Sequence, residues 1–351
     1  MPDYFRKVEK PPKQLVTKGK FEFGTFNAPF EIVNPLDAIK PLPLRLPKLL
    51  KTMRLKEWEA FQIGNKDFFI LTAVYNSKGL GVVQFIVIDL KKNQKYIFQR
   101  FVPFWKTNVA RSLMNTITCS SGKDYSFHIH NHLKNDRIFF NFWSLGNKET
   151  PDMSCRFEAM HDKNSCTPIV ICQPFAENRA LYSHKALMPM SGQLTIDGNN
   201  YEFHKADSFV IMDDHKGYYP FEMVYDWVTT AGYDNKNKLI GFNLTANQIK
   251  NPEKYNENCL WIDGDMQPLP PVTIQRPNGV MSPWIIQDAY KRVNLKFIPK
   301  FDGRINLNLL LFKTQYYAPY GTFSGFILDK KDQQIIFDDF FGMGEKKYIR
   351  A

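Results

Sequence analysis

The amino-acid sequence predicts an all-β protein made of two successive barrels or barrel-like sandwiches of antiparallel strands. Three observations support this prediction. Runs of β-branched and aromatic residues recur along most of the chain and are separated by short polar breaks. Asp-Gly pairs, which favour tight hairpin turns, stand between such runs at 197–198, 263–264 and 302–303. No stretch has the long helical period that would cover a parallel sheet.

The N-terminal arm is expected to be extended and then to lie against the body of the protein. Residues 1–20 are polar and contain the pair Pro11-Pro12. Residues 21–30 alternate aromatic with small residues and end near a proline, which is typical of a segment packed on another surface.

A short helix is expected within the leucine- and lysine-rich residues 41–56. Pro47 suits the first turn of a helix, because its missing N–H has no partner there in any case. Leu49, Leu50 and Met53 would then share one face. Because the helix is so short, we expect this face to cover the protein's own sheet, and contact with a membrane surface is the alternative.

The chain after Trp58 has the pattern of a strand meander, with polar breaks at 77–79, 91–93 and 134–136. Residues 108–115 are the one expected helical interruption. The expected strands of this half are 68–76, 81–89, 96–101, 125–131, 137–145 and 155–160.

Two domains, or one large all-β body, are expected, because 351 residues exceed the usual size of one domain. The strand pattern loosens around 168–178, and 174–178 is the candidate junction. We therefore expect an N-terminal arm with a first β-domain over 1–175. The second β-domain, over 176–351, would carry the stretch Asp213–Gly232.

The formal net charge of +11 raises the question of an anionic partner. The basic residues are scattered and form no long Lys/Arg block, so nucleic acid is not expected as a partner. Peripheral contact with a membrane stays open, and nothing in the sequence indicates the oligomeric state.

Cysteines and targeting segments give little further information. Five cysteines without a CxxC pair indicate reduced, mostly buried thiols and no zinc cluster. The first twenty residues lack an apolar core, and no run approaches the ~18 apolar residues that would span a bilayer. A cytoplasmic location is the simplest expectation.

The stretch Asp213–Gly232 concentrates residue types that suit a pocket. It brings His, Asp, Tyr and Trp into one short span, followed by a second strand around Asn243. Aromatic walls provide contact area, and a few polar groups orient the bound molecule. The residues expected to line a binding site are Trp58, Tyr218, Tyr219, Trp227, Asn243 and Asn258.

A hairpin is expected around the polar turn 234–237. If this turn is a four-residue loop, Tyr233 faces Lys238, and the strand period of two decides which side chains share a face. That register places these residues together: Asp226, Val228, Asn243 and Thr245. This face would form a cavity wall, and a solvent-facing side is the alternative.

Candidate proton-transfer groups lie near this hairpin. His215 follows two aspartates at the end of an apolar strand, and Glu257-Asn258 opens the strand 259–262. An imidazole beside carboxylates can act as an acid or base near neutral pH. If chemistry occurs, Asp226, Glu257 and His215 would exchange protons while Asn243 and Asn258 orient the ligand. The alternative is that the cluster only caps a strand end.

His128, His130 and His132 would point to one face of a strand, as metal ligands sometimes do. No further ligand stands at a recognisable spacing, so a hydrogen-bonded or solvent-facing row is expected and no metal is assigned. The sequence also lacks a P-loop, a dinucleotide fingerprint and a nucleophile elbow. No cofactor is therefore expected.

The order of several motifs resembles a known family. The residues that carry the resemblance are Leu55–Trp58, Pro189–Gly192, Asp213–Gly232, Gly241–Leu244, Glu257-Asn258, Asp263-Gly264, Tyr320–Gly325 and Gly342–Glu345. Together they look like an uncharacterised bacterial family of domains of unknown function. That family is similar to the double lipocalin-like (calycin) proteins related to carotenoid hydratase and tocopherol cyclase.

The resemblance covers the chain from about Phe21 to its end, and it implies two packed lipocalin-like β-barrels with a preference for hydrophobic, isoprenoid or lipid ligands. It implies no reaction, because the family has none assigned. Lys216 and Tyr219 stand where that pattern commonly has Arg and Trp. Lys lacks the planar fork of Arg, so a bidentate anion contact would be lost.

We therefore expect the protein to bind a hydrophobic small molecule in a β-barrel cavity at or near the domain junction. Acid–base conversion such as hydration, isomerisation or cyclisation would be compatible with its side chains. A carrier without turnover is a second hypothesis, and a non-catalytic interaction protein with a basic surface is a third. Asp226→Asn is expected to weaken ligand retention or turnover with little loss of folding.

Overall fold

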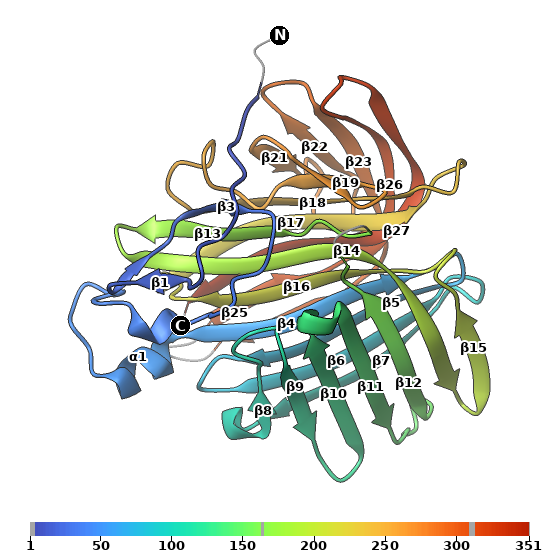
Figure 1. Ribbon diagram of the computed structural model, residues 1–351. Helices are drawn as coiled ribbons and strands as arrows, with labels where there is room; N and C mark the ends of the chain where they lie inside the picture. The colour runs from blue at the N-terminus through green and yellow to red at the C-terminus, as the bar shows by residue number, and fades with distance from the viewer. Residues whose placement is uncertain (1–3, 163–164, 309–312, 351) are drawn as a thin grey trace.

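The computed structural model describes residues 4–162, 165–308 and 313–350, and it is built almost entirely of antiparallel strands. Two large sheets dominate, and a pair of short strands lies beside them (Figure 1). The first sheet forms a nearly closed barrel and the second a half-barrel. The expected all-β fold of two tandem barrels is confirmed.

The first sheet has fourteen strands, in the order β7-β6-β5-β4-β16-β14-β12-β11-β10-β9-β8, with β13, β15 and β3 attached through β14 and β13. Its strands are β3 (Gly24–Phe26), β4 (Lys56–Gly64), β5 (Phe68–Asn76), β6 (Gly81–Asp89), β7 (Gln94–Val102), β8 (Thr107–Asn108), β9 (Thr116–Ser121), β10 (Tyr125–His132), β11 (Arg137–Ser144), β12 (Met153–Met160), β13 (Ile169–Ala176), β14 (Arg179–Ile196), β15 (Asn199–Phe203) and β16 (Phe209–Gly217).

The second sheet has eleven strands, in the order β20-β19-β18-β17-β27-β26-β23-β22-β21, with β25 paired to β27 and β24 paired to β25. Its strands are β17 (Glu222–Tyr233), β18 (Leu239–Asn247), β19 (Cys259–Ile262), β20 (Asp265–Pro268), β21 (Val272–Gln275), β22 (Trp284–Asp288), β23 (Val293–Phe301), β24 (Arg304–Asn308), β25 (Lys313–Tyr317), β26 (Tyr320–Leu328) and β27 (Gln334–Arg350). The separate pair is β1 (Val16–Thr17) and β2 (Lys20–Phe21).

The strands expected from the sequence are present with closely similar bounds. Two of them, 68–76 and 81–89, coincide with β5 and β6. The Asp-Gly pairs at 197–198 and 263–264 form the hairpin turns after β14 and β19, and all four of these residues have positive φ. Two successive positive φ values match the right-handed twist of the flanking strands.

The helical prediction for 108–115 is wrong, because this segment is irregular after β8. The helix expected after Pro47 is present as α1 (Lys48–Arg54). Short 3-10 turns occur at η1 (Pro35–Asp37), η2 (Phe104–Lys106) and η3 (Leu133–Asn135). No helix in the described ranges is long and apolar enough to cross a membrane.

Each large sheet curls around its own packed hydrophobic core. The first contains stacked and edge-to-face phenylalanines such as Phe85 and Phe142, whose ring centroids lie 4.0 Å apart. The second contains Trp284, Phe297 and Phe323, all fully buried. Aromatic side chains therefore fill the concave side of both sheets.

The chain passes from the first sheet to the second between Gly217 and Glu222. Position 175/176, at which the sequence predicts the division into domains, lies in the hairpin of β13 and β14. Strands β14 and β16, which follow that position, pair with strands of the first sheet.

The N-terminal arm packs on the body, as the sequence indicated for residues 21–30. Phe21, Phe26 and Phe30 are buried in a cluster with Tyr182, and β3 pairs with β13. Earlier in the arm, the buried Arg6 donates from Nη1 and Nη2 to the backbone oxygens of Asn256 and Asn258, each at 2.5 Å. The arm thus fixes the loop before β19.

Candidate ligand-binding and acid–base site

A cavity of about 630 Å³ lies between the two sheets. Its walls come from the convex side of β4, β5 and β16 and from the facing side of β17 and β27. The sequence led us to expect a barrel cavity at or near the domain junction. The cavity lies at the junction of the two sheets and outside both barrel interiors, which are filled by core side chains. The lining includes Trp58, Ala60, Ala73, Tyr75, Phe101, Leu181, Lys185, Asp213, His215, Tyr219, Met223, Tyr225, Trp227, Thr245, Glu257, Tyr316, Glu345 and Lys347.

Strand β16 supplies the central polar groups of the cavity. Both faces of this strand are buried, so its charged side chains lie inside the protein. Alternation along the strand sends Asp213 and His215 into the cavity, whereas Asp214 and Lys216 point the other way and form an ion pair of 2.6 Å. The neighbouring strand β14 places Lys185 directly opposite Asp213 in the ladder. Register alone therefore brings a buried cation beside a buried carboxylate.

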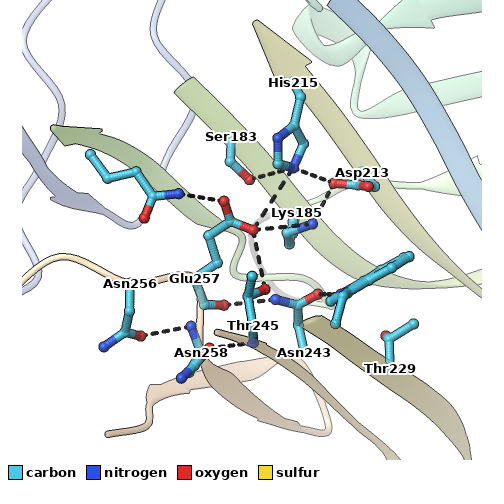
Figure 2. A network of polar contacts seen from close by, with 12 residues as sticks. Ser183, Lys185, Asp213, His215, Thr229, Asn243, Thr245, Asn256, Glu257 and Asn258 are labelled. Atoms are coloured by element: carbon cyan, nitrogen blue, oxygen red, sulfur yellow. Dashed lines mark hydrogen bonds and ion pairs between the residues drawn. The ribbon is translucent and has the colours of Figure 1, made fainter. Parts of the chain in front are cut away.

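Four ionisable side chains converge on one wall of the cavity (Figure 2). His215 Nε2 lies 2.6 Å from Asp213 Oδ1 and 3.8 Å from Glu257 Oε2. Lys185 Nζ makes an ion pair with Asp213 and lies 3.5 Å from Glu257 Oε2. Ser183 Oγ stands 3.1 Å from the same imidazole nitrogen. All of these side chains are nearly inaccessible to solvent.

The electrostatics of this cluster favour an ionised Asp213–Lys185 pair. Burial alone would raise the pKa of Asp213, but the charges and hydrogen bonds of His215 and Lys185 outweigh it and lower the pKa. Burial would likewise lower the pKa of Lys185, but Asp213 and Glu257 raise it overall. Asp213 therefore stays charged at neutral pH and accepts hydrogen bonds and ion pairs from its neighbours.

Aromatic side chains cover the imidazole. Trp58 stacks on His215, and Tyr219 stacks on Trp58 with 5.6 Å between centroids. Tyr219 Oη lies 3.4 Å from His215 Nδ1. Burial raises the pKa of Tyr219 well above its ordinary value, so the phenol keeps its proton and can donate it to the imidazole. Tyr219, His215 and Asp213 thus form one hydrogen-bonded series.

The opposite wall, from β25 and β27, carries a second charged pair of residues. Glu345 accepts a hydrogen bond from Tyr316 Oη, and burial raises the pKa of Glu345. Lys347 Nζ lies 5.0 Å from the ring centroid of Tyr316 and 5.4 Å from that of Tyr225. Burial lowers the pKa of Lys347. An ammonium among aromatic faces in an apolar cavity suits an oxygen atom of a ligand.

Two of the predicted binding residues support the wall from behind. Asn243 Oδ1 accepts a hydrogen bond of 2.6 Å from Trp227 Nε1, and its Nδ2 donates to the backbone oxygen of Glu257 at 2.9 Å. Asn258 Oδ1 accepts from the backbone nitrogen of Thr245 at 2.7 Å. Neither amide lines the cavity. They hold Trp227 and the Glu257 loop in place.

The carboxylate of Glu257 is held by side chains from both sheets. Gln173 Nε2 donates to Glu257 Oε1 at 2.5 Å, and Thr245 Oγ1 lies 3.4 Å from Oε2. Gln173 comes from β13 of the first sheet and Thr245 from β18 of the second. The cluster therefore joins the two halves of the molecule.

The expected register of the hairpin is wrong by one residue. Tyr233 pairs with Leu239, not with Lys238, so Asp226 faces Ala246 and no longer shares a side with Asn243. A shift of one residue sends every side chain of a strand to the opposite face. Asp226 consequently lies outside the cavity and makes an ion pair of 2.9 Å with Arg276.

The other predicted site residues divide between the cavity and the core. Trp58, Tyr219, Trp227, His215 and Glu257 line the cavity. Tyr218 is fully buried on the other side of the turn, in the cluster that holds the N-terminal arm, and does not line it.

Sequence reasoning missed Lys185 and Lys347 as cavity residues. A signal for Lys185 exists, because a lysine inside the apolar run 180–190 contradicts a buried strand unless a carboxylate pairs with it. Asp213 was recognised only as a neighbour of His215, although two-residue alternation places both on one face. Lys347 lies in a polar C-terminal segment that gives no such signal.

The row of histidines on β10 lies on the outer side of the first barrel. The ring centroids of His128 and His130 are 6.1 Å apart, and those of His130 and His132 are 6.2 Å apart. His128 Nδ1 contacts Ser126 Oγ at 3.2 Å. Within the described ranges, no three His, Cys, Asp or Glu side chains are grouped so as to hold a metal ion.

Comparison with known proteins identifies a family but no activity. The family model described as "Domain of unknown function (DUF2804)" matches residues 6–350, which confirms the family indicated by the sequence motifs. No curated protein is significantly similar to the chain.

Two solved structures are similar to this chain at low identity. One is kievitone hydratase from Nectria haematococca, with 11% identity, a TM-score of 0.45, and coverage of 84% of this chain and 88% of that one. The other is a protein described provisionally as AttH from Nitrosomonas europaea, with 10% identity, a TM-score of 0.46, and coverage of 87% and 96%. Identities this low are no guide to the ligand or reaction of this chain.

Proposed function

This chain belongs to the DUF2804 family, and we propose from its cavity that it binds a hydrophobic small molecule between its two sheets and acts on it by proton transfer. The cavity suits such a ligand because aromatic and aliphatic side chains form most of its walls. Its volume of about 630 Å³ falls within the ordinary range for small-molecule sites.

One observation carries the proposal: Lys185, Asp213, His215 and Glu257 lie within 4 Å of one another's charged atoms at the wall of a cavity lined mostly by apolar side chains. Burying four ionisable groups is costly, so a fold that only needed stability would place apolar side chains there. Groups that exchange protons have a reason to occupy this position.

The roles follow from the geometry. His215 donates a proton to an oxygen or an unsaturated carbon of the ligand, while Tyr219 and Asp213 orient the imidazole from its two nitrogens. The carboxylate of Glu257 removes a proton from the ligand or from an attacking water. Hydration, isomerisation and cyclisation each need one such donor and one such acceptor, and none of them needs an added oxidant or reductant.

Ligand binding is tested first, by extracting the purified protein with organic solvent and identifying the released molecules by mass spectrometry. Ala73→Trp fills the cavity from β5 and should abolish retention. Ser154→Trp adds the same side chain on β12, which does not line the cavity, and should retain ligand like the wild type. Equal retention by both variants would show that the molecules bind elsewhere.

Turnover is tested with the extracted molecule and with hydrophobic alkenes or enones as probes. His215→Asn and Asp213→Asn should lose turnover while they still retain ligand, since neither change closes the cavity. Wild-type protein that retains a ligand and returns it unchanged would instead identify a carrier. One observation favours the carrier hypothesis: both carboxylate oxygens of Glu257 already contact protein side chains, those of Gln173 and Thr245.

A further inference from the structure

The open end of the cavity carries apolar side chains that the proposed chemistry does not use. Two lining residues are exposed, Gly79 and Phe101, and both lie where the strands of the first sheet begin or end. The register places the other strand ends beside them, because Gly81 pairs with Val102 and Lys56 pairs with Gly217. The mouth of the cavity is therefore at this end of the sheet.

Helix α1 leads directly into this mouth. Its last residue, Arg54, lines the cavity, and none of its seven residues is buried. Leu49 and Leu50 are 71% and 47% exposed. The helix lies outside both sheets, at the left of the view in Figure 1. The expectation that its apolar face covers the protein's own sheet is therefore wrong.

Other segments at the same end also expose large apolar side chains. Trp105 in η2 is 71% exposed, and η2 is tied to the end of β5 by a hydrogen bond from Asn76 Nδ2 to the Phe104 oxygen. Phe221, in the turn between β16 and β17, is 54% exposed next to the lining residue Pro220. We call this set the mouth face: Leu49, Leu50, Met53, Phe101, Trp105 and Phe221.

The charge around the mouth face is strongly basic. Residues 39–56 contain six Lys or Arg and no Asp or Glu. Lys51 Nζ donates to the backbone oxygens of Leu36, at 2.6 Å, and of Ala38, at 3.0 Å, which anchors the helix to the preceding segment. Lys48 is exposed beside Leu49. Cations interleaved with leucines and an exposed Trp are the composition of a surface that binds anionic lipid.

We propose that the mouth face docks on an anionic lipid bilayer, with the opening of the cavity turned toward the membrane. The apolar side chains enter the acyl boundary while the exposed cations Lys40, Arg45 and Lys48 contact the headgroups. A hydrophobic ligand then passes between bilayer and cavity without crossing water. A folded protein partner would have to match the same mixture of leucines and positive charge, and a second copy of this chain would meet its own positive charge.

The test is flotation of the full chain with vesicles of phosphatidylcholine and phosphatidylglycerol in equal parts, at low and at high salt. Wild-type protein should float with these vesicles, less at high salt, and less with vesicles of phosphatidylcholine alone. Leu49→Gln with Leu50→Gln should reduce the bound fraction about tenfold, because two anchoring side chains are lost. Both leucines are exposed, so folding should be unaffected.

Ile336→Gln is the matched control, since Ile336 is 54% exposed and lies near the start of β27, far along the strand from Glu345, Lys347 and Ile349, which line the cavity. It should float like the wild type. Wild-type protein that stays unbound, or a leucine double variant that binds as well as the control, overturns the docking proposal. Vesicle binding is measured without added ligand, so its outcome is independent of turnover.

Discussion

The indole of Trp58 lies parallel to the imidazole of His215, with 4.4 Å between ring centroids and 11° between the planes. The same indole donates from Nε1 to Asp213 Oδ2 at 3.3 Å. One side chain from β4 therefore fixes both members of the Asp213–His215 pair.

Trp58→Phe should separate the two contributions of the indole. The ring stack is kept but the hydrogen bond to a charged carboxylate is lost, so turnover or ligand retention should fall about tenfold. Trp58→Leu removes the stack as well, so turnover or ligand retention should fall further than in Trp58→Phe. Steady-state turnover and ligand retention of the two variants measure this. Equal values for Phe and Leu would show that the stack contributes nothing.

Lys185 and Asp213 should be strongly coupled in stability. Lys185→Met leaves two carboxylates without their buried cation and should cost about 3–5 kcal/mol in the free energy of unfolding. In the double variant, Lys185→Met with Asp213→Asn, much of this loss should be recovered because no unpaired charge remains. Denaturant unfolding of the four proteins gives the coupling energy. If the losses of unfolding free energy in the two single variants simply add up in the double variant, Lys185 and Asp213 do not form a coupled buried pair.

Glu59 should make stability depend on pH through a separate site inside the first barrel. Burial and the charge of Asp214 raise the pKa of Glu59 to about 7, against the hydrogen bonds from Thr118 and Asn131. Between the unfolded pKa of 4.5 and this value, the native state holds a proton that the unfolded state has released. Stability should therefore fall as pH rises across this window, by the order of 3 kcal/mol.

Glu59→Gln keeps the shape of the side chain and removes its titration. Its unfolding free energy should be flatter than that of the wild type between pH 4.5 and about 7, and higher than the wild type above that window. Unfolding at several pH values checks this difference. A wild-type curve parallel to that of the variant would show that Glu59 ionises normally in the native protein.

Asp226→Asn should leave ligand retention unchanged, in contrast to the expectation from the sequence. The side chain is part-exposed, pairs with Arg276 and lies outside the cavity. The variant replaces a partly buried ion pair with a neutral hydrogen-bond acceptor for Arg276, which should cost about 1–2 kcal/mol. Retention and thermal unfolding test both statements. If the variant folds normally but loses the ligand, Asp226 does contribute to ligand binding.

The strands could be predicted from the sequence because each one is encoded locally. Phe68–Asn76 and Gly81–Asp89 are bounded by polar breaks that end the β pattern at both sides. The hairpin register could not be fixed, because Asp234 closes a turn with Lys238 that is one residue longer than expected. A single residue in a turn decided whether the side of β17 that carries Asp226 or the side that carries Trp227 faces the cavity.

The position of the cavity could not be predicted either. Alternation in β4 or β16 distinguishes two faces, but both faces of these strands are buried, and the sequence does not say which one lines a core. The contacts that hold Glu257 come from Gln173 in the other sheet. Such contacts depend on how the sheets stack, and no short-range pattern encodes that stacking.

Because the cavity lies between the sheets, its width is set by how the two halves pack against each other, through a buried cluster that contains Leu71 from β5 and Trp227 from β17. A change in the angle at which the halves meet would reshape the binding space while leaving both phenylalanine-filled interiors intact. Substitutions at lining positions outside the hydrophobic clusters, such as Ala73 or Thr245, offer a route to new ligands that bypasses the usual conflict between altered specificity and a damaged core.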